Sequence, residues 1–192
     1  MPTQCNAEQL EFSCVERRRV VAAFDGGTVS SDAGALLLGK ADEAIGLIDR
    51  LAGCFVDERD PDLIEHTVRT LIGQRVFGMA LGYEDLNDHE QLRHDPVLGA
   101  LLGKLEPQRR TDCAALAGKS TLNRLELHAA QGRSRYHKIR PDTEAIERLW
   151  VQVFLDAHRT APAEVILDLD ATDDPLHGRQ EGRFFHGYYD GY

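Results

Sequence analysis

The sequence predicts an α+β fold, in which a mainly helical N-terminal region is followed by the first two strands of a sheet. In three segments apolar residues recur every three or four positions, as on a helix with one buried face. Two later runs are rich in branched and aromatic residues, which favour strands. The expected helices are 32–51, 60–82 and 142–157, and the two late strands are 164–170 and 183–189. We therefore divide the chain into a helical region, 1–160, and the start of a sheet domain, 161–192.

The N-terminal segment predicts an arm, a short strand and a helix start. Residues 1–15 mix polar and apolar types without a period, which is typical of a poorly ordered terminus. Residues 19–24 (RVVAAF) predict a strand that ends in an Asp-Gly-Gly turn. The side-chain oxygens of residues 30–32 (SSD) can cap the first helix, because they accept hydrogen bonds from first-turn amides.

The central helices are marked by their end signals. Asp60 as cap, Pro61 at the first helical position and Gly82 after the last apolar residue delimit one long helix with a core-facing stripe. Pro96 divides the following segment, 85–105, into two short helical pieces. The basic stretch 106–141 comes next, before the best-patterned helix of the chain.

Within the basic stretch, the run Gly118-Lys119-Ser120-Thr121 is similar to the end of a phosphate-binding loop. Such a loop needs a glycine where this chain has Cys113, and no strand precedes it, so nucleotide binding is disfavoured. A helix-turn-helix suits the segment better, with a first helix over 111–117 and a second one capped by Ser120. An ordinary basic surface helix is the alternative. The candidate DNA-binding residues are Lys119, Ser120, Asn123, Arg124, Arg133 and Arg135.

The late strand 164–170 ends in carboxylates. Strand alternation places Asp168 and Asp170 on one face, where two like charges repel unless a cation bridges them. Magnesium prefers such oxygen ligands, although a turn at the strand end would also favour an acid. His89 and His94 lie near acids, but exposed helix charges explain them better than metal binding does. His177 and His186 are loop histidines without a helical i, i+4 spacing and are weak evidence for a metal site.

Composition limits the function classes. A formal net charge of -10 argues against a protein whose whole surface binds a polyanion. It is compatible with a local basic patch. The four cysteines form no CxxC pair, so a zinc knuckle or disulfide framework is not expected. The chain has no apolar run of the roughly 20 residues that span a bilayer, and we expect a cytoplasmic protein with no membrane partner.

Four segments, in the expected order, resemble the N-terminal portion of a DDE-type transposase from a bacterial insertion sequence. They are 24–34 (FDGGTVSSDAG), the helical stretch 86–96, 119–126 (KSTLNRLE) and 167–178 (LDLDATDDPLHG). The last of them, which runs on to the aromatic residues 184–189, is the most specific.

The resemblance implies a ribonuclease H-like catalytic domain that follows a helical DNA-binding region. It places the first catalytic carboxylate and metal ligand on Asp170, in an Asp-x-Thr setting with Thr172, with Asp168 as the fallback. Family chemistry uses Mg²⁺ or Mn²⁺ ions held by three carboxylates to activate the attacking oxygen and stabilise the leaving one. The second aspartate and the glutamate come much later in complete members. We therefore expect a chain truncated after its first catalytic aspartate, which binds metal weakly and cuts DNA poorly or not at all.

Three functions follow as hypotheses. The first is a transposase fragment from a family that catalyses metal-dependent DNA cleavage and strand transfer in DNA transposition. The second is a non-catalytic DNA-binding remnant or inhibitor that occupies the inverted repeats at transposon ends, alone, as a homo-oligomer or with full-length transposase. The third is a metal-dependent phosphohydrolase that uses Asp168 and Asp170.

Overall fold

The structure is a computed structural model of the chain and describes most of its 192 residues. It describes residues 10–15, 17–22, 29–109, 113–126, 136–169, 184–188 and 190–191. The chain divides into two compact units, Met1–Phe154 and Leu155–Tyr192, which are described separately. Helices and short strands occur together in the first unit, which confirms the α+β class.

An antiparallel hairpin forms the N-terminal part. Strand β1 (Leu10–Val15) pairs with β2 (Arg18–Ala22) in a register that places Phe12 opposite Val20. Arg17 adopts a positive φ of 68° in the connecting turn. The strand predicted over 19–24 is confirmed over 19–22, and residues 23–24 lie outside the described part. The prediction of an irregular arm is wrong for residues 10–15, because β2 supplies their backbone hydrogen-bond partners.

The first predicted helix is divided in two. Helix α1 (Ala35–Ile45) ends at Gly46, whose φ of +67° is left-handed, and α2 (Leu47–Ala52) begins directly after it. No side chain caps α1, and the amide of Ala35 instead donates to the carbonyl oxygen of Asp32. Glycine adopts this left-handed conformation without a steric penalty, so a single glycine inside an apolar stripe was enough to end the helix.

The second predicted helix is also interrupted. After strand β3 (Phe55–Asp57), Asp60 and Pro61 start only a short 3-10 helix, η1 (Pro61–Leu63). Ile64 is extended, and the long helix α3 (Val68–Ala80) starts later with the side chain of Thr67 as its cap. The predicted start at Asp60 is therefore wrong, whereas the predicted end is confirmed by Gly82, at a φ of +92° two residues past the helix.

Pro96 separates two short helical pieces, as predicted. The first consists of η2 (Leu86–Asp88) and α4 (His89–Leu92), and the second is α5 (Pro96–Leu101). The carboxylate of Asp95 accepts hydrogen bonds from the amides of Val97 and Leu98 at 2.8 and 2.9 Å, which caps α5.

In its described part, the basic stretch 106–141 holds one helix and one short strand. Helix α6 (Lys119–Glu126) forms as expected, but residues 113–118 are not helical, so no first helix of a helix-turn-helix is seen there; residues 111–112 lie outside the described part. Strand β4 (Ile139–Pro141) pairs antiparallel with β3, an association that the sequence did not predict. Helix α7 (Thr143–Asp156) confirms the predicted helix after Pro141.

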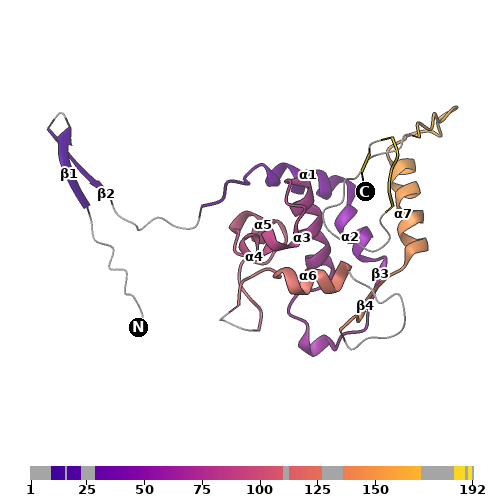
Figure 1. The fold of residues 1–192 in the computed structure, drawn as a ribbon, viewed down its shortest axis with the longest axis horizontal. Helices are drawn as coiled ribbons and strands as arrows, with labels where there is room; N and C mark the ends of the chain where they lie inside the picture. The colour runs from indigo at the N-terminus through magenta and orange to yellow at the C-terminus, as the bar shows by residue number, and fades with distance from the viewer. Residues whose placement is uncertain are drawn as a thin grey trace. The chain divides into compact units, whose positions relative to one another are not determined.

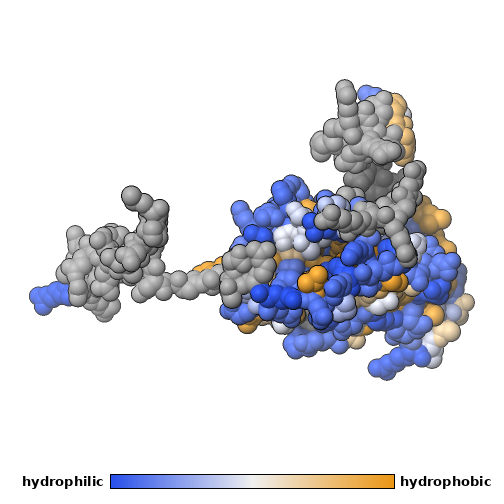
Figure 2. All heavy atoms as spheres, turned by 90° about the horizontal axis from the view of Figure 1, so that it is seen from below, coloured by the Kyte–Doolittle hydropathy of each residue, from blue (hydrophilic) through white to orange (hydrophobic). Residues whose placement is uncertain are grey.

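Two neighbouring apolar clusters form the core, and α3 contributes to both. In Figure 1, α3 lies among the other helices of the first unit. One cluster joins α3 to α2, α4 and α5 through residues such as Ile48, Phe77 and Leu98. The other joins α3 to α6 and β4 through Leu71, Leu122 and Ile139. Among the residues that Figure 2 colours by hydropathy, hydrophilic ones predominate on the face that is seen. Among the described residues, none of the helices is long and apolar enough to cross a membrane.

The second unit has little regular structure in its described part. Residues 164–169 form no strand, and Ile166 and Leu169 are 85% and 91% exposed. In the described residues of the second predicted strand, 184–188, the structure shows one isolated bridge, from His186 to Gly191. The strand prediction is thus wrong over 164–169, because a branched apolar run pairs as a strand only where a partner takes its backbone hydrogen bonds.

Candidate nucleic-acid interface

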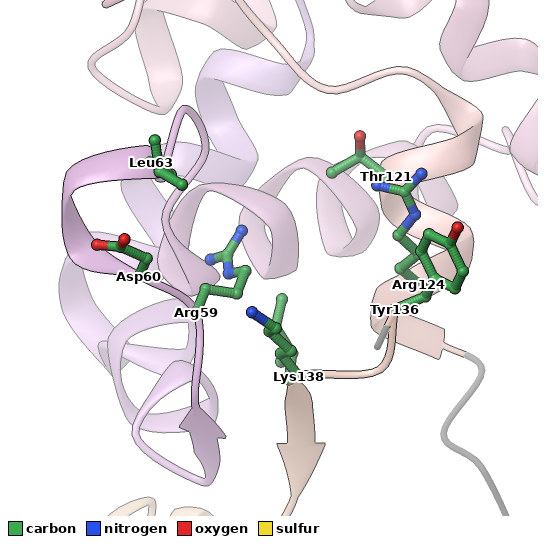
Figure 3. A pocket seen from close by; sticks show the side chains of 8 residues that line it. Arg59, Asp60, Leu63, Thr121, Arg124, Tyr136 and Lys138 are labelled. Carbon is green, nitrogen blue, oxygen red and sulfur yellow. The ribbon is translucent and has the colours of Figure 1, made fainter. Parts of the chain in front are cut away.

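A hollow of about 240 Å³ lies where three segments meet: the loop after β3, helix α6 and the approach to β4 (Figure 3). We call it the basic hollow. Its lining residues are Arg59, Asp60, Leu63, Thr121, Arg124, Tyr136, Lys138 and Ile139. The pairing of β3 with β4 builds it, since the backbone amide of Glu58 also donates to the carbonyl oxygen of Lys138 at 2.8 Å and so draws the two segments together.

Arg59 is held rigidly on one side of the basic hollow. Its Nε donates to Oδ1 of Asp57 at 2.8 Å and its Nη2 to Oδ2 at 2.7 Å. This two-point contact is the main reason that the pKa of Asp57 lies below its ordinary value. Because Asp57 offsets the charge of Arg59, this arginine contributes its fixed position and its remaining N–H donors more than net charge.

Arg124 and Lys138 carry the uncompensated positive charge of the basic hollow. Both are exposed, and neither pairs with a carboxylate among the residues that the structure describes. The guanidinium of Arg124 lies 5.8 Å from the ring centre of Tyr136, a cation–π distance, and Figure 3 shows the two side chains beside each other. Among the described lining residues, Asp60 is the one acid, and its Oδ1 caps η1.

Helix α6 brings Thr121 and Arg124 to the basic hollow because its opposite face is buried. Leu122 and Leu125 are packed in the core beneath it. At its C-terminal end, Glu126 pairs with Arg75 of α3, whose guanidinium also donates to the carbonyl oxygens of Tyr83 and Glu84. With only 8 residues, α6 depends on these contacts rather than on its own propensity.

The predicted DNA-binding residues fall into four groups. Arg124 lines the basic hollow, whereas Ser120 and Asn123 are exposed on α6 outside its lining, and Ser120 lies inside the helix instead of capping it. Lys119 makes a contact within the protein, in which its Nζ donates to Oδ1 of Asn87 at 3.0 Å. Arg133 and Arg135 lie outside the described residues.

Sequence reasoning missed most of the other lining residues. Lys138 belongs to the basic stretch and could have been chosen from its position there. Arg59 lies in an acidic loop, Glu58-Arg59-Asp60, and gave no signal of its own. Tyr136 is an aromatic residue among cations, a combination typical of nucleic-acid binding, and that pattern was the available signal.

The comparison with protein families decides what the chain is. A family model described as transposase DDE domain, group 1, matches residues 12–192. The chain belongs to this family. No curated protein matches the chain, and no solved structure does.

This DDE-type transposase chain comes from a family whose members act in DNA transposition, typically with a divalent metal. The family resemblance expected from the sequence is therefore confirmed, while an origin in a bacterial insertion sequence stays a prediction. DNA is the partner that the family implies.

The expected metal ligands of the transposase are not gathered in the described part of the chain. Asp168 is exposed in the unpaired segment 164–169, and Asp170 lies outside the described residues. Among the residues described, no three His, Cys, Asp or Glu side chains lie close enough together to hold an ion. The described residues therefore do not by themselves fit the metal that the family implies, nor the phosphohydrolase hypothesis, and the role of Asp170 stays a prediction.

The histidines near acids have other surroundings than a metal site. His89 is fully buried and contacts the side chain of Gln74, while the Nε2 of His94 lies 3.3 Å from Nε of Arg93. His186 takes part in the isolated bridge to Gly191, and His177 lies outside the described residues.

Proposed function

We propose that this chain binds the inverted-repeat ends of a transposon through the basic hollow, as a step of DNA transposition. The observation that supports this most strongly is the pair Arg124 and Lys138, two cations without described acid partners on one hollow of a transposase-family chain.

Charge distribution supports a local contact. The net charge of -10 repels DNA from most of the surface, so a phosphate backbone is attracted only where cations exceed acids. Lysine, arginine and hydroxyl side chains are the usual phosphate contacts, and Lys138, Arg124 and Thr121 supply all three types. The ring of Tyr136 restricts Arg124 before DNA arrives, which lowers the entropy lost on binding.

A double substitution tests this proposal. We expect Arg124→Ala with Lys138→Ala to weaken binding to inverted-repeat duplex at least tenfold and to reduce the slope of log affinity against log salt by about 2, since each lost phosphate contact lowers it by about 1. Fluorescence anisotropy titrations between low and physiological salt measure both quantities.

The matched control removes two cations elsewhere. Lys40 and Arg148 are exposed and pair with Glu43 and Glu144, so Lys40→Ala with Arg148→Ala changes net charge equally without touching the basic hollow. Equal losses of affinity in the two double variants would show that only overall charge matters and would refute the proposed site.

We further propose that the catalytic part of the function, metal-dependent DNA cleavage and strand transfer by a ribonuclease H-like domain, places its first carboxylate on Asp170. Its support is the Asp-x-Thr setting of that residue in a DDE-family chain. Asp168 is the alternative ligand. Binding without cleavage remains the second candidate function, and the basic hollow serves both.

Paramagnetic Mn²⁺ distinguishes the two aspartates. We expect substoichiometric Mn²⁺ to broaden the backbone NMR signals around residues 168–172 of the 192-residue chain, and Asp170→Ala to abolish this broadening while Asp168→Ala leaves most of it. The reverse order would assign the ligand to Asp168, and identical broadening in both variants would exclude either as the principal ligand.

A further inference from the structure

A buried set of polar contacts connects α3, α4 and the segment just before α6. Gln74 of α3 and His89 of α4 are both 0% exposed. The Nε2 of Gln74 donates to the carbonyl oxygen of Ala117 at 2.7 Å, and the amide of Ala117 donates to Oε1 of Gln74 at 2.9 Å. The same Nε2 lies 3.1 Å from Nδ1 of His89. We call this set, Gln74, His89 and the backbone of Ala117, the amide lock.

The backbone of Ala117 fixes the direction of every hydrogen bond in the amide lock. A backbone N–H only donates and a carbonyl oxygen only accepts, so the side-chain amide of Gln74 has one orientation that satisfies both. Its NH₂ group then faces Nδ1 of His89, which must accept. His89 is therefore neutral, with its proton on Nε2, and that atom is buried without a partner among the described residues.

The amide lock holds the segment from which α6 starts. Ala117 lies two residues before the helix, and its side chain packs in the same cluster as Leu122 and Leu125. Next to it, the amide of Leu116 donates to the carbonyl oxygen of Arg93, and the amide of Lys119 donates to Oε1 of Glu90. The start of α6, and with it Thr121 and Arg124 at the basic hollow, is thus placed by contacts to α3 and α4.

A second proton on His89 is incompatible with this arrangement. It would set an N–H on Nδ1 against the NH₂ of Gln74, and turning the amide to present Oε1 would break both bonds to Ala117. The ring has no room to withdraw toward α3, because a Cβ placed on Gly78 would lie 2.9 Å from its Cε1.

The charged groups around His89 do not compensate for this conflict. Burial is the largest influence and lowers the pKa of His89, and Arg75 of α3 lowers it further. Asp88 of η2 and Glu126 of α6 act in the opposite direction, but the net effect is a pKa below the ordinary value.

We propose that Gln74 and His89 are positioning residues that hold α6 in its DNA-binding placement, and that protonation of His89 releases the start of this helix. The DNA part of this inference rests on the proposed function. Their effect is indirect, because neither side chain reaches the basic hollow.

Hydrogen exchange without DNA tests the amide lock itself. We expect the protection factors of the Ala117 and Leu122 amides to fall together as the pH is lowered below about 6.5, the ordinary pKa of histidine. His89→Gln keeps a neutral acceptor for Gln74 and cannot be protonated. In this variant the protection factors of the same two amides should therefore not change with pH. His94→Gln, on an exposed histidine of the same segment, should behave as the unaltered chain. Indistinguishable profiles for the unaltered chain and His89→Gln would overturn the inference.

A measurement on the unaltered chain covers the case in which His89→Gln does not fold. The ¹⁵N shifts of the His89 ring at pH 8 should show the neutral form with the proton on Nε2; a proton on Nδ1 would overturn the amide lock.

DNA affinity separates this inference from the function on which it rests. Other histidines also gain charge at low pH, so the informative quantity is the affinity of the unaltered chain relative to His89→Gln. We expect this ratio to fall at least about fivefold between pH 7.5 and pH 5.5, since losing either of the two bonds to Ala117 corresponds to about 1 kcal/mol. If protection falls but the ratio stays constant, the amide lock stands and the assignment of the basic hollow to DNA fails.

Discussion

Leu122→Ala is expected to lower the free energy of unfolding by about 2–5 kcal/mol, the usual range for removing a buried leucine side chain and leaving a cavity. Leu122 is 0% exposed and packs between α3 and β4. The loss is of the order of one third of the whole stability of a typical domain, about 5–15 kcal/mol. Urea denaturation followed by far-UV circular dichroism measures it.

Asn123→Ala is the matched control, because Asn123 neighbours Leu122 on α6 and is exposed. Its effect should stay within about 0.5 kcal/mol. If Leu122→Ala costs no more than Asn123→Ala, then α6 does not pack on the core, and the placement of Arg124 at the basic hollow is wrong as well.

Lys104→Met is expected to destabilise the fold by about 2 kcal/mol, within the range for hydrogen bonds to charged groups. The ammonium of Lys104 is nearly buried and donates to the backbone oxygen of Glu65, to Oε1 of Glu65 at 2.8 Å and to Nδ1 of His66 at 3.1 Å. Methionine keeps the alkyl packing but leaves these acceptors without their common donor. Burial and, next, the charge of Lys104 lower the pKa of His66 to about 4, so His66 is a neutral acceptor at pH 7.

The destabilisation by Lys104→Met should shrink in acid. Burial alone would raise the pKa of Glu65, but hydrogen bonds from Lys104 and from the amides of Gln108 and Arg109 outweigh it, so the pKa is lowered. A lowered carboxylate pKa contributes stability that is present above the unfolded value and is lost as the pH falls through the folded value. Lys40→Met removes an exposed pair with Glu43 and should cost less than about 0.5 kcal/mol. A cost for Lys104→Met as small as this control would contradict the buried role of Lys104.

Periodicity predicted where most helices lie, but not where they are interrupted. Gly46 ends α1, and the extended Ile64 delays the start of α3, although both lie inside continuous apolar stripes. Such a stripe indicates which face of a helix is buried and does not specify the local φ and ψ. Asp95 and Pro96 were different, because a cap followed directly by proline specifies backbone geometry as well as position.

Part of the basic hollow could be predicted from the local sequence, and part of it depends on contacts between distant segments. Arg124 and Lys138 belong to the basic stretch, whose composition already predicted that it binds an anion. The structure places both residues in the lining of one hollow. Arg59 joins them only because β3 pairs with β4, a contact between segments far apart in the chain that no window of sequence encodes. His89 was predicted to be exposed, but it is buried. The prediction failed because the contact of His89 with Gln74 joins two different helices and is also non-local.

The amphipathic helix α7 has a practical consequence for spectroscopy. Trp150 is the one tryptophan of the chain, lies on α7 and is 52% exposed. Its fluorescence therefore reports the surroundings of α7 and does not directly sense the packing of α3 against α6. A blue shift of the emission on adding DNA or on raising the protein concentration would reveal that a partner covers α7, even where circular dichroism records no change.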